Sequence, residues 1–144
     1  MHKGIYCIVL RNPACSLSIG ALGRVTFRAG FHVYVGSALG PGGLARVTRH
    51  IRCALGDIRK PRWHIDYLLM SDKFSLVRVH CFPTEERLEC HLASLIPGDM
   101  VRGFGCSDCL CTTHLFSFAL DPGEIIPDTA AILGLSALSK TIKK

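Results

Sequence analysis

The sequence predicts an α+β protein in which helices flank a small central antiparallel β-sheet, and three features favour this class. Residues 4–10 form an almost continuously apolar run, which is typical of a central strand. Residues 44–55 carry apolar side chains at spacings of three and four, as an amphipathic helix does. Glycine and proline breaks separate short segments of both kinds. No linker or repeat divides residues 1–144, so we expect a single domain.

Further strands are expected at residues 25–27, 31–35, 75–82 and 114–120, where β-branched and aromatic residues concentrate. The first two of these are predicted to pair as a hairpin across a short glycine-containing turn. Within the second, apolar residues alternate with polar ones, so Tyr34 is expected to point away from the apolar face.

Three helices are expected. In the first, Leu44, Val47, Ile51 and Leu55 would form the buried stripe, with Arg46 and His50 as an i, i+4 pair off that stripe. Gly56 would end it.

The second helix is predicted from Glu85 to about Ile96, with Thr84 as its N-cap. A short closing helix is predicted over residues 127–138, followed by a basic tail. Residues 63–69 fit neither strand nor helix firmly, and a Gly/Cys-rich loop is expected at residues 103–112.

The charge of the chain favours a polyanionic partner. Lysine and arginine number 17 against 11 acidic residues, which gives a net charge of +6. Six of the cations gather around the first helix and its exit loop: Arg46, Arg49, Arg52, Arg59, Lys60 and Arg62. Such a cluster is suited to a phosphate backbone. The alternative is a solvated basic surface.

Eight cysteines without an export signal indicate a reducing compartment, and we expect a cytoplasmic protein with no membrane association. Cys106, Cys109, Cys111 and His114 are close enough in sequence to suggest zinc. A loop with reduced thiols is the favoured reading, because no second distant pair completes the usual zinc pattern. A zinc-stabilised interaction domain stays open as a third function class.

The residues best suited to chemistry are two tyrosines, an arginine, a histidine and a glutamate on consecutive predicted elements. Phosphodiester hydrolysis needs an activated water and neutralisation of charge on the phosphate. An arginine supplies a planar cationic fork, and a carboxylate is suited to a hard metal such as Mg²⁺. The candidates are Tyr6, Tyr34, Arg46, His50, and Glu89 or Glu85. Each of them alone also fits a packing or surface role.

Taken in order, these residues resemble the motifs of the GIY-YIG nuclease family. The matching segments are Gly4-Ile5-Tyr6, Tyr34-Val35-Gly36, the helix carrying Arg46 and His50, and Glu89. The resemblance covers residues 4–96. A longer set of segments, residues 34–38, 49–50, 63–67 and 103–109, is similar to a branch of small prokaryotic, mostly archaeal, GIY-YIG-like domains, some of them fused to base-excision-repair endonucleases. Residues 16–30 depart from the family as an inserted hairpin that lengthens the connection between the tyrosines.

By this resemblance Tyr6 or Tyr34 is the general base, and Arg46 stabilises the charged transition state. His50 assists by hydrogen bonding or proton transfer. Glu89 binds one Mg²⁺ or Mn²⁺ ion. Gly36 lets the backbone come close to the site.

The expected function is a metal-dependent endonuclease acting on nucleic acid, with DNA favoured over RNA, in repair or processing, with repair enzymes as possible partners. The alternative is a nucleic-acid-binding module of the same fold that does not cleave. Contacts to the nucleic acid are expected from Arg49, Arg52, Lys60, Arg62, Trp63 and His64. Trp63 could stack on a base, or it could be a core residue.

Overall fold

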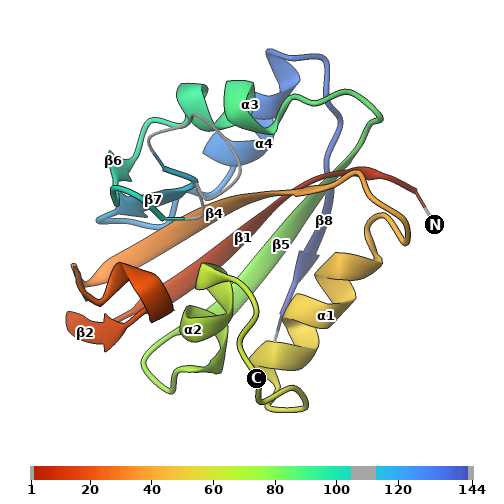
Figure 1. The fold of residues 1–144 in the computed structure, drawn as a ribbon. Helices are drawn as coiled ribbons and strands as arrows, with labels where there is room; N and C mark the ends of the chain where they lie inside the picture. The colour runs from red at the N-terminus through yellow and green to blue at the C-terminus, as the bar shows by residue number, and fades with distance from the viewer. Residues whose placement is uncertain (1, 105–112, 143–144) are drawn as a thin grey trace.

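The computed structural model describes residues 2–104 and 113–142, and a six-stranded antiparallel sheet lies at its centre (Figure 1). The strands follow the order β6-β7-β4-β1-β5-β8, and β2 and β3 form a separate two-stranded sheet. The predicted α+β class with a central antiparallel sheet is confirmed. The elements are β1 Gly4–Asn12, β2 Cys15–Ser18, the 3-10 turn η1 Gly20–Leu22, β3 Arg24–Phe27, β4 Gly30–Ala38, α1 Ala45–Ala54, α2 His64–Met70, β5 Ser75–Pro83, α3 Glu89–Leu95, β6 Asp99–Met100, β7 Leu115–Phe118, α4 Ile125–Ala131 and β8 Leu138–Thr141.

The two central strands, β1 and β4, pair along their whole length, from Gly4 opposite Ala38 to Asn12 opposite Gly30. Both strands are buried on both faces, which explains the continuous apolar run at residues 4–10. Because side chains alternate along a strand, Tyr6 and its even-numbered neighbours face one core, and the odd-numbered residues face the other.

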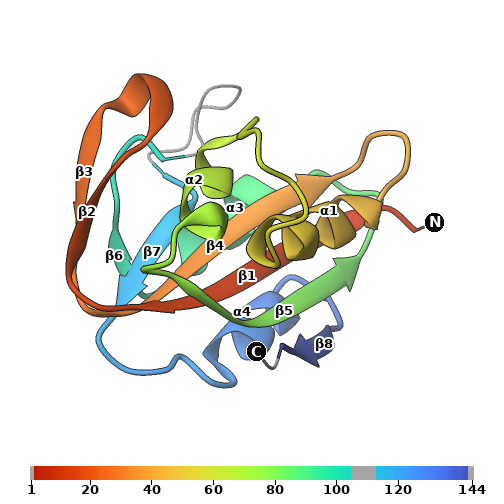
Figure 2. The same cartoon turned by 90° about the horizontal axis from the view of Figure 1, so that it is seen from below.

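Of the helices in the described ranges, two cover each face of the sheet. Helices α1 and α2 pack on the face that carries Tyr6 and Tyr34, and α3 and α4 pack on the opposite face (Figures 1 and 2). Tyr34 and Val33 therefore belong to different cores, as the alternating pattern predicts. The face under α1 and α2 is the one that carries the candidate catalytic residues.

The predicted pairing of residues 25–27 with 31–35 is wrong. Strand β3 pairs with β2, and β4 pairs with β1 and β7. The hairpin β2–η1–β3 is therefore an insertion at the tip of the long β1–β4 hairpin (Figure 2). Its local turn signals are real, but β4 gains far more hydrogen bonds along the nine residues of β1 than a short partner offers.

The second predicted helix begins later than expected, at Glu89 rather than Glu85. The Thr84 hydroxyl accepts the backbone N–H of Glu86 at 3.1 Å, so it closes a turn instead of capping the helix. Leu88 occupies the N-cap position. As a result Glu89 lies in the first helical turn, next to the cavity described below.

The first helix buries only part of the predicted stripe, because Val47 is buried and Leu44 and Ile51 pack against the core while Leu55 does not. Leu55 lies beyond the end of α1 and is 57% exposed, whereas His50 is only 1% exposed and faces the core. The prediction that His50 lies off the buried stripe is therefore wrong. Polar partners supplied by α2 and β1 make its burial possible.

The C-terminal region also differs from the prediction. Helix α4 spans Ile125–Ala131 rather than residues 127–138, and the expected tail contains β8, which pairs with β5 at the edge of the sheet. Residues 63–69 fall almost entirely within helix α2. Within the described ranges, no helix is long and apolar enough to cross a bilayer.

Candidate active site

An open cavity of about 380 Å³ lies beside the C-terminal half of β4, with α1 and the start of α2 and α3 at its walls. Seven of the residues predicted to act in catalysis, metal binding or nucleic-acid contact line it. The lining residues are Tyr6, Tyr34, Ser37, Leu39, Gly40, Arg46, Arg62, Trp63, His64, Arg87, Glu89 and His114. Segments more than eighty residues apart in the chain therefore meet at one place.

The topology explains why the cavity forms here. Strand β7 pairs with β4 from Phe31 to Tyr34, and the Val35 N–H still donates to the His114 carbonyl, but the part of β4 after Val35 has no ladder partner on that side among the described strands. Helix α3 contacts β4, and its first turn brings Glu89 to this edge. The loop after β4 then turns into α1, which presents Arg46 to the same space.

The two tyrosines are largely buried but border the cavity. Tyr6 is 2% exposed and Tyr34 is 8% exposed, and their ring centroids are 6.4 Å apart. The Tyr6 ring lies across β4 at Gly36, its partner in the ladder. A Cβ atom at Gly36 would lie 2.2 Å from Cζ of Tyr6. Gly36 is therefore required by the space that Tyr6 occupies rather than by a turn of the backbone.

We expect Gly36→Ala to destabilise the protein by about 1–3 kcal/mol, because the added methyl group overlaps the Tyr6 ring in a closely packed region. Urea unfolding measures this change. Gly40→Ala is the matched control, since a Cβ at Gly40 meets nothing within 4 Å. Equal unfolding free energies for the two variants would contradict the proposed packing.

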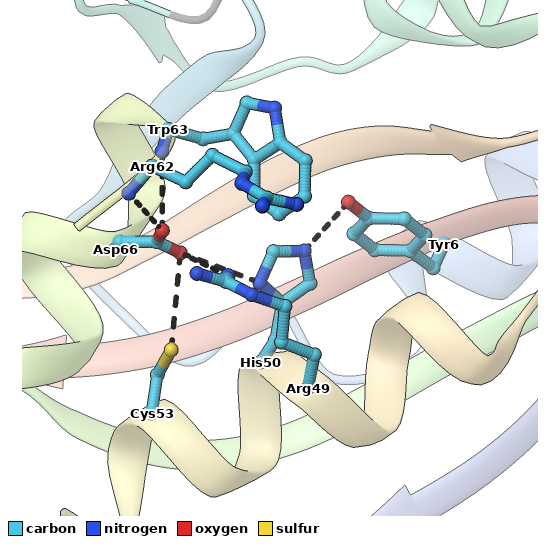
Figure 3. Close-up of polar contacts among 7 residues, drawn as sticks. All are labelled: Tyr6, Arg49, His50, Cys53, Arg62, Trp63 and Asp66. Atoms are coloured by element: carbon cyan, nitrogen blue, oxygen red, sulfur yellow. Dashed lines mark hydrogen bonds and ion pairs between the residues drawn. The ribbon is translucent and has the colours of Figure 1, made fainter. Parts of the chain in front are cut away.

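Tyr6 is protonated in this environment. Burial, first, and the neighbouring Tyr34 hydroxyl raise the pKa of Tyr6 well above its usual value, and Arg46 opposes this only in part. The Tyr6 hydroxyl is hydrogen-bonded to Nε2 of His50 at 2.8 Å (Figure 3). A proton leaving Tyr6 would therefore have an acceptor within hydrogen-bonding distance.

Arg46 is held in a fixed position at the wall of the cavity. One of its Nη atoms donates to the carbonyl oxygen of Ser37 at 2.8 Å, and its guanidinium lies 4.9 Å from the centre of the Trp63 ring. Because the Arg46 side chain is already held in place, it loses little conformational entropy when a phosphate binds.

Trp63 is surrounded by cations. The guanidinium groups of Arg46, Arg49 and Arg62 lie 4.7–5.4 Å from its ring centre, and its ring contacts His50 edge to face. A base could stack on Trp63 only after one of these arginines moved. The arrangement makes Trp63 a support for the arginines next to the tyrosines.

Asp66 is the central residue that the sequence reasoning missed. Its carboxylate is fully buried and accepts the backbone N–H groups of Arg62 and Trp63 and one Nη of Arg49 (Figure 3). Burial alone would raise the pKa of Asp66, but the neighbouring His50 together with these hydrogen bonds holds it well below its usual range. The available signal was its position three residues after the helix N-cap Trp63, which is typical of a capping carboxylate.

The structure separates the predicted nucleic-acid contacts into two groups. Arg62, Trp63 and His64 line the cavity, whereas Arg49 points to Asp66, and Arg52 and Lys60 are exposed residues that do not border the cavity. Arg87, which was not singled out from the sequence, adds a cation to the cavity wall. Glu85, the alternative metal ligand, borders a different surface depression.

Glu89 is suited to a metal that keeps most of its water ligands. Its side chain is 28% exposed, and Oε2 lies 4.0 Å from Nδ1 of His114. Within residues 2–104 and 113–142, no group of three or more histidine, cysteine and acidic side chains is placed to hold a metal. One carboxylate together with water and phosphate oxygens fits Mg²⁺ or Mn²⁺ and does not fit a closed zinc site.

The suggested zinc ligands Cys106, Cys109 and Cys111 lie outside the described residues. The fourth, His114, is buried, with Nε2 3.7 Å from Sγ of Cys90. The zinc-stabilised alternative therefore stays a prediction.

Comparison with known proteins gives one match. No curated protein and no solved structure matches the chain. Residues 5–132 match the family described as Domain of unknown function DUF123. This range contains the cavity and almost every element of the fold, and the chain therefore belongs to the DUF123 family.

Proposed function

We propose that the protein is a GIY-YIG-type endonuclease that hydrolyses phosphodiester bonds with the help of a divalent metal ion, acting on DNA in repair or processing. The observation that carries the proposal is the convergence of Tyr6, Tyr34, Arg46 and Glu89 on one open cavity. These are the residue types that the reaction needs, and they come from four different elements.

The charges at the cavity support a phosphate ligand. Arg46, Arg62 and Arg87 border it, and Glu89 is the one carboxylate that balances them among the described lining residues. Arginine forks bind phosphate oxygens in pairs, and several of them can hold one phosphodiester in a fixed orientation. Binding is therefore expected to weaken as the salt concentration rises.

Each residue then has a distinct role. Arg46, held by Ser37 and Trp63, faces the phosphate and stabilises the charge that builds up on it during attack by water. Tyr6 orients this water and takes its proton. Glu89 would hold the metal ion, which when bound polarises the phosphate and supplies further positive charge.

The first experiment is cleavage of end-labelled duplex and branched DNA by the purified protein over a series of Mg²⁺ or Mn²⁺ concentrations. We expect Glu89→Gln to raise the metal concentration needed for half-maximal cleavage at least about tenfold, since it removes the charged ligand. Glu85→Gln, a glutamate outside the cavity, is the matched control. Identical metal dependence of the two variants would exclude Glu89 as the ligand.

The alternative is a module that binds nucleic acid without cleaving it. The near-complete burial of both tyrosines and the raised pKa of Tyr6 favour this alternative, because they make the phenols poor bases in the free protein. A mobility-shift assay run beside the cleavage assay separates the two functions. A binding module retards the labelled strand and leaves it whole at every metal concentration.

A further inference from the structure

The inference concerns Asp66, and it rests on the proposed phosphodiesterase function. Tyr6 needs a partner that takes its proton, because burial keeps the phenol neutral in the free protein. His50 Nε2 is hydrogen-bonded to the Tyr6 hydroxyl at 2.8 Å, and it is a partner that can accept a proton, whereas Arg46, which also interacts with this hydroxyl, can only donate. On the other side of the His50 ring lies the carboxylate of Asp66 (Figure 3).

The geometry around His50 favours one of its two tautomers. Nδ1 is buried, lacks a hydrogen-bond partner within the described part of the chain, and lies 3.7 Å from Oδ1 of Asp66. An ionised carboxylate can only accept hydrogen bonds, so the tautomer with hydrogen on Nδ1 is the favoured one. Nε2 then has a free lone pair directed at the Tyr6 hydroxyl, 2.8 Å away.

The carboxylate is itself rigidly held. Oδ2 accepts the backbone N–H groups of Arg62 at 2.7 Å and Trp63 at 3.1 Å, and Oδ1 accepts from Arg49 at 3.0 Å. These contacts fasten the first turn of α2 to the face of α1 that carries His50. Asp66 thus has no freedom to turn away from the imidazole ring.

We propose that Asp66 is a positioning residue that keeps His50 as a proton acceptor for Tyr6. During attack, a proton passes from water to the Tyr6 oxygen, and the Tyr6 proton passes to Nε2 of His50. The water oxygen forms the new bond to phosphorus with its lone pair, and the bond to the leaving oxygen breaks with its electrons. The leaving oxygen takes a proton from solvent, and His50 later releases its proton to solvent.

Asp66 contributes to this transfer in two ways. It keeps Nε2 free of hydrogen before the transfer, and its negative charge balances the imidazolium that forms afterwards. The 3.7 Å separation is longer than a direct hydrogen bond and would shorten when His50 becomes cationic. The same arrangement gives Tyr6 an acceptor for its own proton, so we assign Tyr6 as the residue that accepts the proton of water.

The charges around His50 set the direction of the expected titration. Burial disfavours the protonated form of His50 most, Arg49 and Arg46 add to this, and Asp66 opposes it, so the net effect is a lowered pKa for His50. Tyr6 contacts the ring from β1 as a neutral hydroxyl. Removal of the Asp66 charge should therefore lower the pKa of His50 further.

The test is Asp66→Asn, with Asp57→Asn as control because Asp57 is an exposed carboxylate just after α1. We expect Asp66→Asn to lower kcat for DNA cleavage about a hundredfold with KM for DNA unchanged. The acidic limb of the pH–rate profile should move to lower pH, as the pKa of His50 falls. A purely structural role would reduce the amount of folded enzyme and leave this limb in place.

A second measurement does not depend on activity. Nitrogen-15 NMR of histidine in the folded wild-type protein should show His50 neutral near pH 7 with hydrogen on Nδ1, and Asp66→Asn should lower its pKa. A hydrogen on Nε2 in the wild-type protein would overturn the inference even if Asp66→Asn fails to fold. If Asp66→Asn has the same kcat and pH profile as the wild type, the inference about Asp66 is overturned and the nuclease proposal stays intact. A wild-type protein that cleaves no nucleic acid would instead refute the proposed function.

Discussion

Replacement of Arg46 by alanine is expected to lower kcat for phosphodiester cleavage by about a thousandfold. The guanidinium is aimed at the cavity by its hydrogen bond to the Ser37 carbonyl and its packing on Trp63. A charge fixed in this way before the reaction stabilises the transition state without reorganisation, and loss of such a group typically costs a factor of 10²–10⁵. Single-turnover cleavage of labelled duplex DNA at saturating Mg²⁺ measures the effect.

Two further variants make the result specific. Arg24→Ala removes an exposed arginine of β3 that lies outside the cavity, and it should retain nearly full activity. Arg46→Lys keeps the positive charge but loses the planar fork, so its rate should fall between those of Arg46→Ala and the wild type. Cleavage by Arg46→Ala within tenfold of the wild-type rate would remove Arg46 from the mechanism. Circular dichroism checks that the variants are folded.

The central part of the fold follows from short-range patterns in the sequence. The apolar run at residues 4–10 indicates a strand buried on both faces, and alternation in residues 31–35 places Tyr34 on the face that Tyr6 shares. These patterns depend only on the two-residue period of a strand, and the pairing of β1 with β4 then brings the two tyrosines together.

Errors arose where distant segments decide the structure. Turn residues indicate a bend before β4, but the partner of β4 depends on the competition between β1 and β3, which no local pattern reveals. The burial of His50 depends on Tyr6 and Asp66, which lie in other elements. A polar residue on a predicted helix is reasonably expected at the surface unless its partners are known.

Asp66 was missed for a related reason. A carboxylate three residues into a helix is a common capping residue, and nothing in its own segment indicates that it also faces a histidine on another helix. Only the packing of α1 against α2 gives it the second role. The residues of the site that the sequence revealed are those with a recognisable motif, and the one that supports them became visible only in three dimensions.

The buried histidines predict a steep loss of stability in acid. His32 and His80 are 1% and 3% exposed, and burial lowers the pKa of each from 6.5 to about 4, with Arg78 adding to the effect at His80. The unfolded chain therefore binds protons at a higher pH than the folded protein does. Stability is full above pH 6.5 and is lost as pH falls toward 4.

The surroundings of His32 explain why a proton is so unfavourable there. The amide nitrogen of Asn12 donates to two backbone carbonyls, so its Oδ1 accepts a hydrogen from Nδ1 of His32. Nε2 of His32 has no hydrogen-bond partner within the described residues, and the ring packs edge to face with Phe27 and Phe74. A protonated Nε2 would thus be an unpaired cation among aromatic rings.

The expected size of the effect is a loss of about 5 kcal/mol in the free energy of unfolding between pH 7.5 and pH 4.5, about half from each histidine. This loss is comparable to the whole stability of a small domain. Urea unfolding at a series of pH values measures it.

His80→Gln should remove about half of the pH dependence, because glutamine does not titrate, whereas His91→Gln, an exposed site, should leave it unchanged. A stability that stays constant from pH 7.5 to 4.5 would mean that both rings reach water before the fold opens. In that case acid would stop the proposed cleavage only by protonating His50, with the fold still intact.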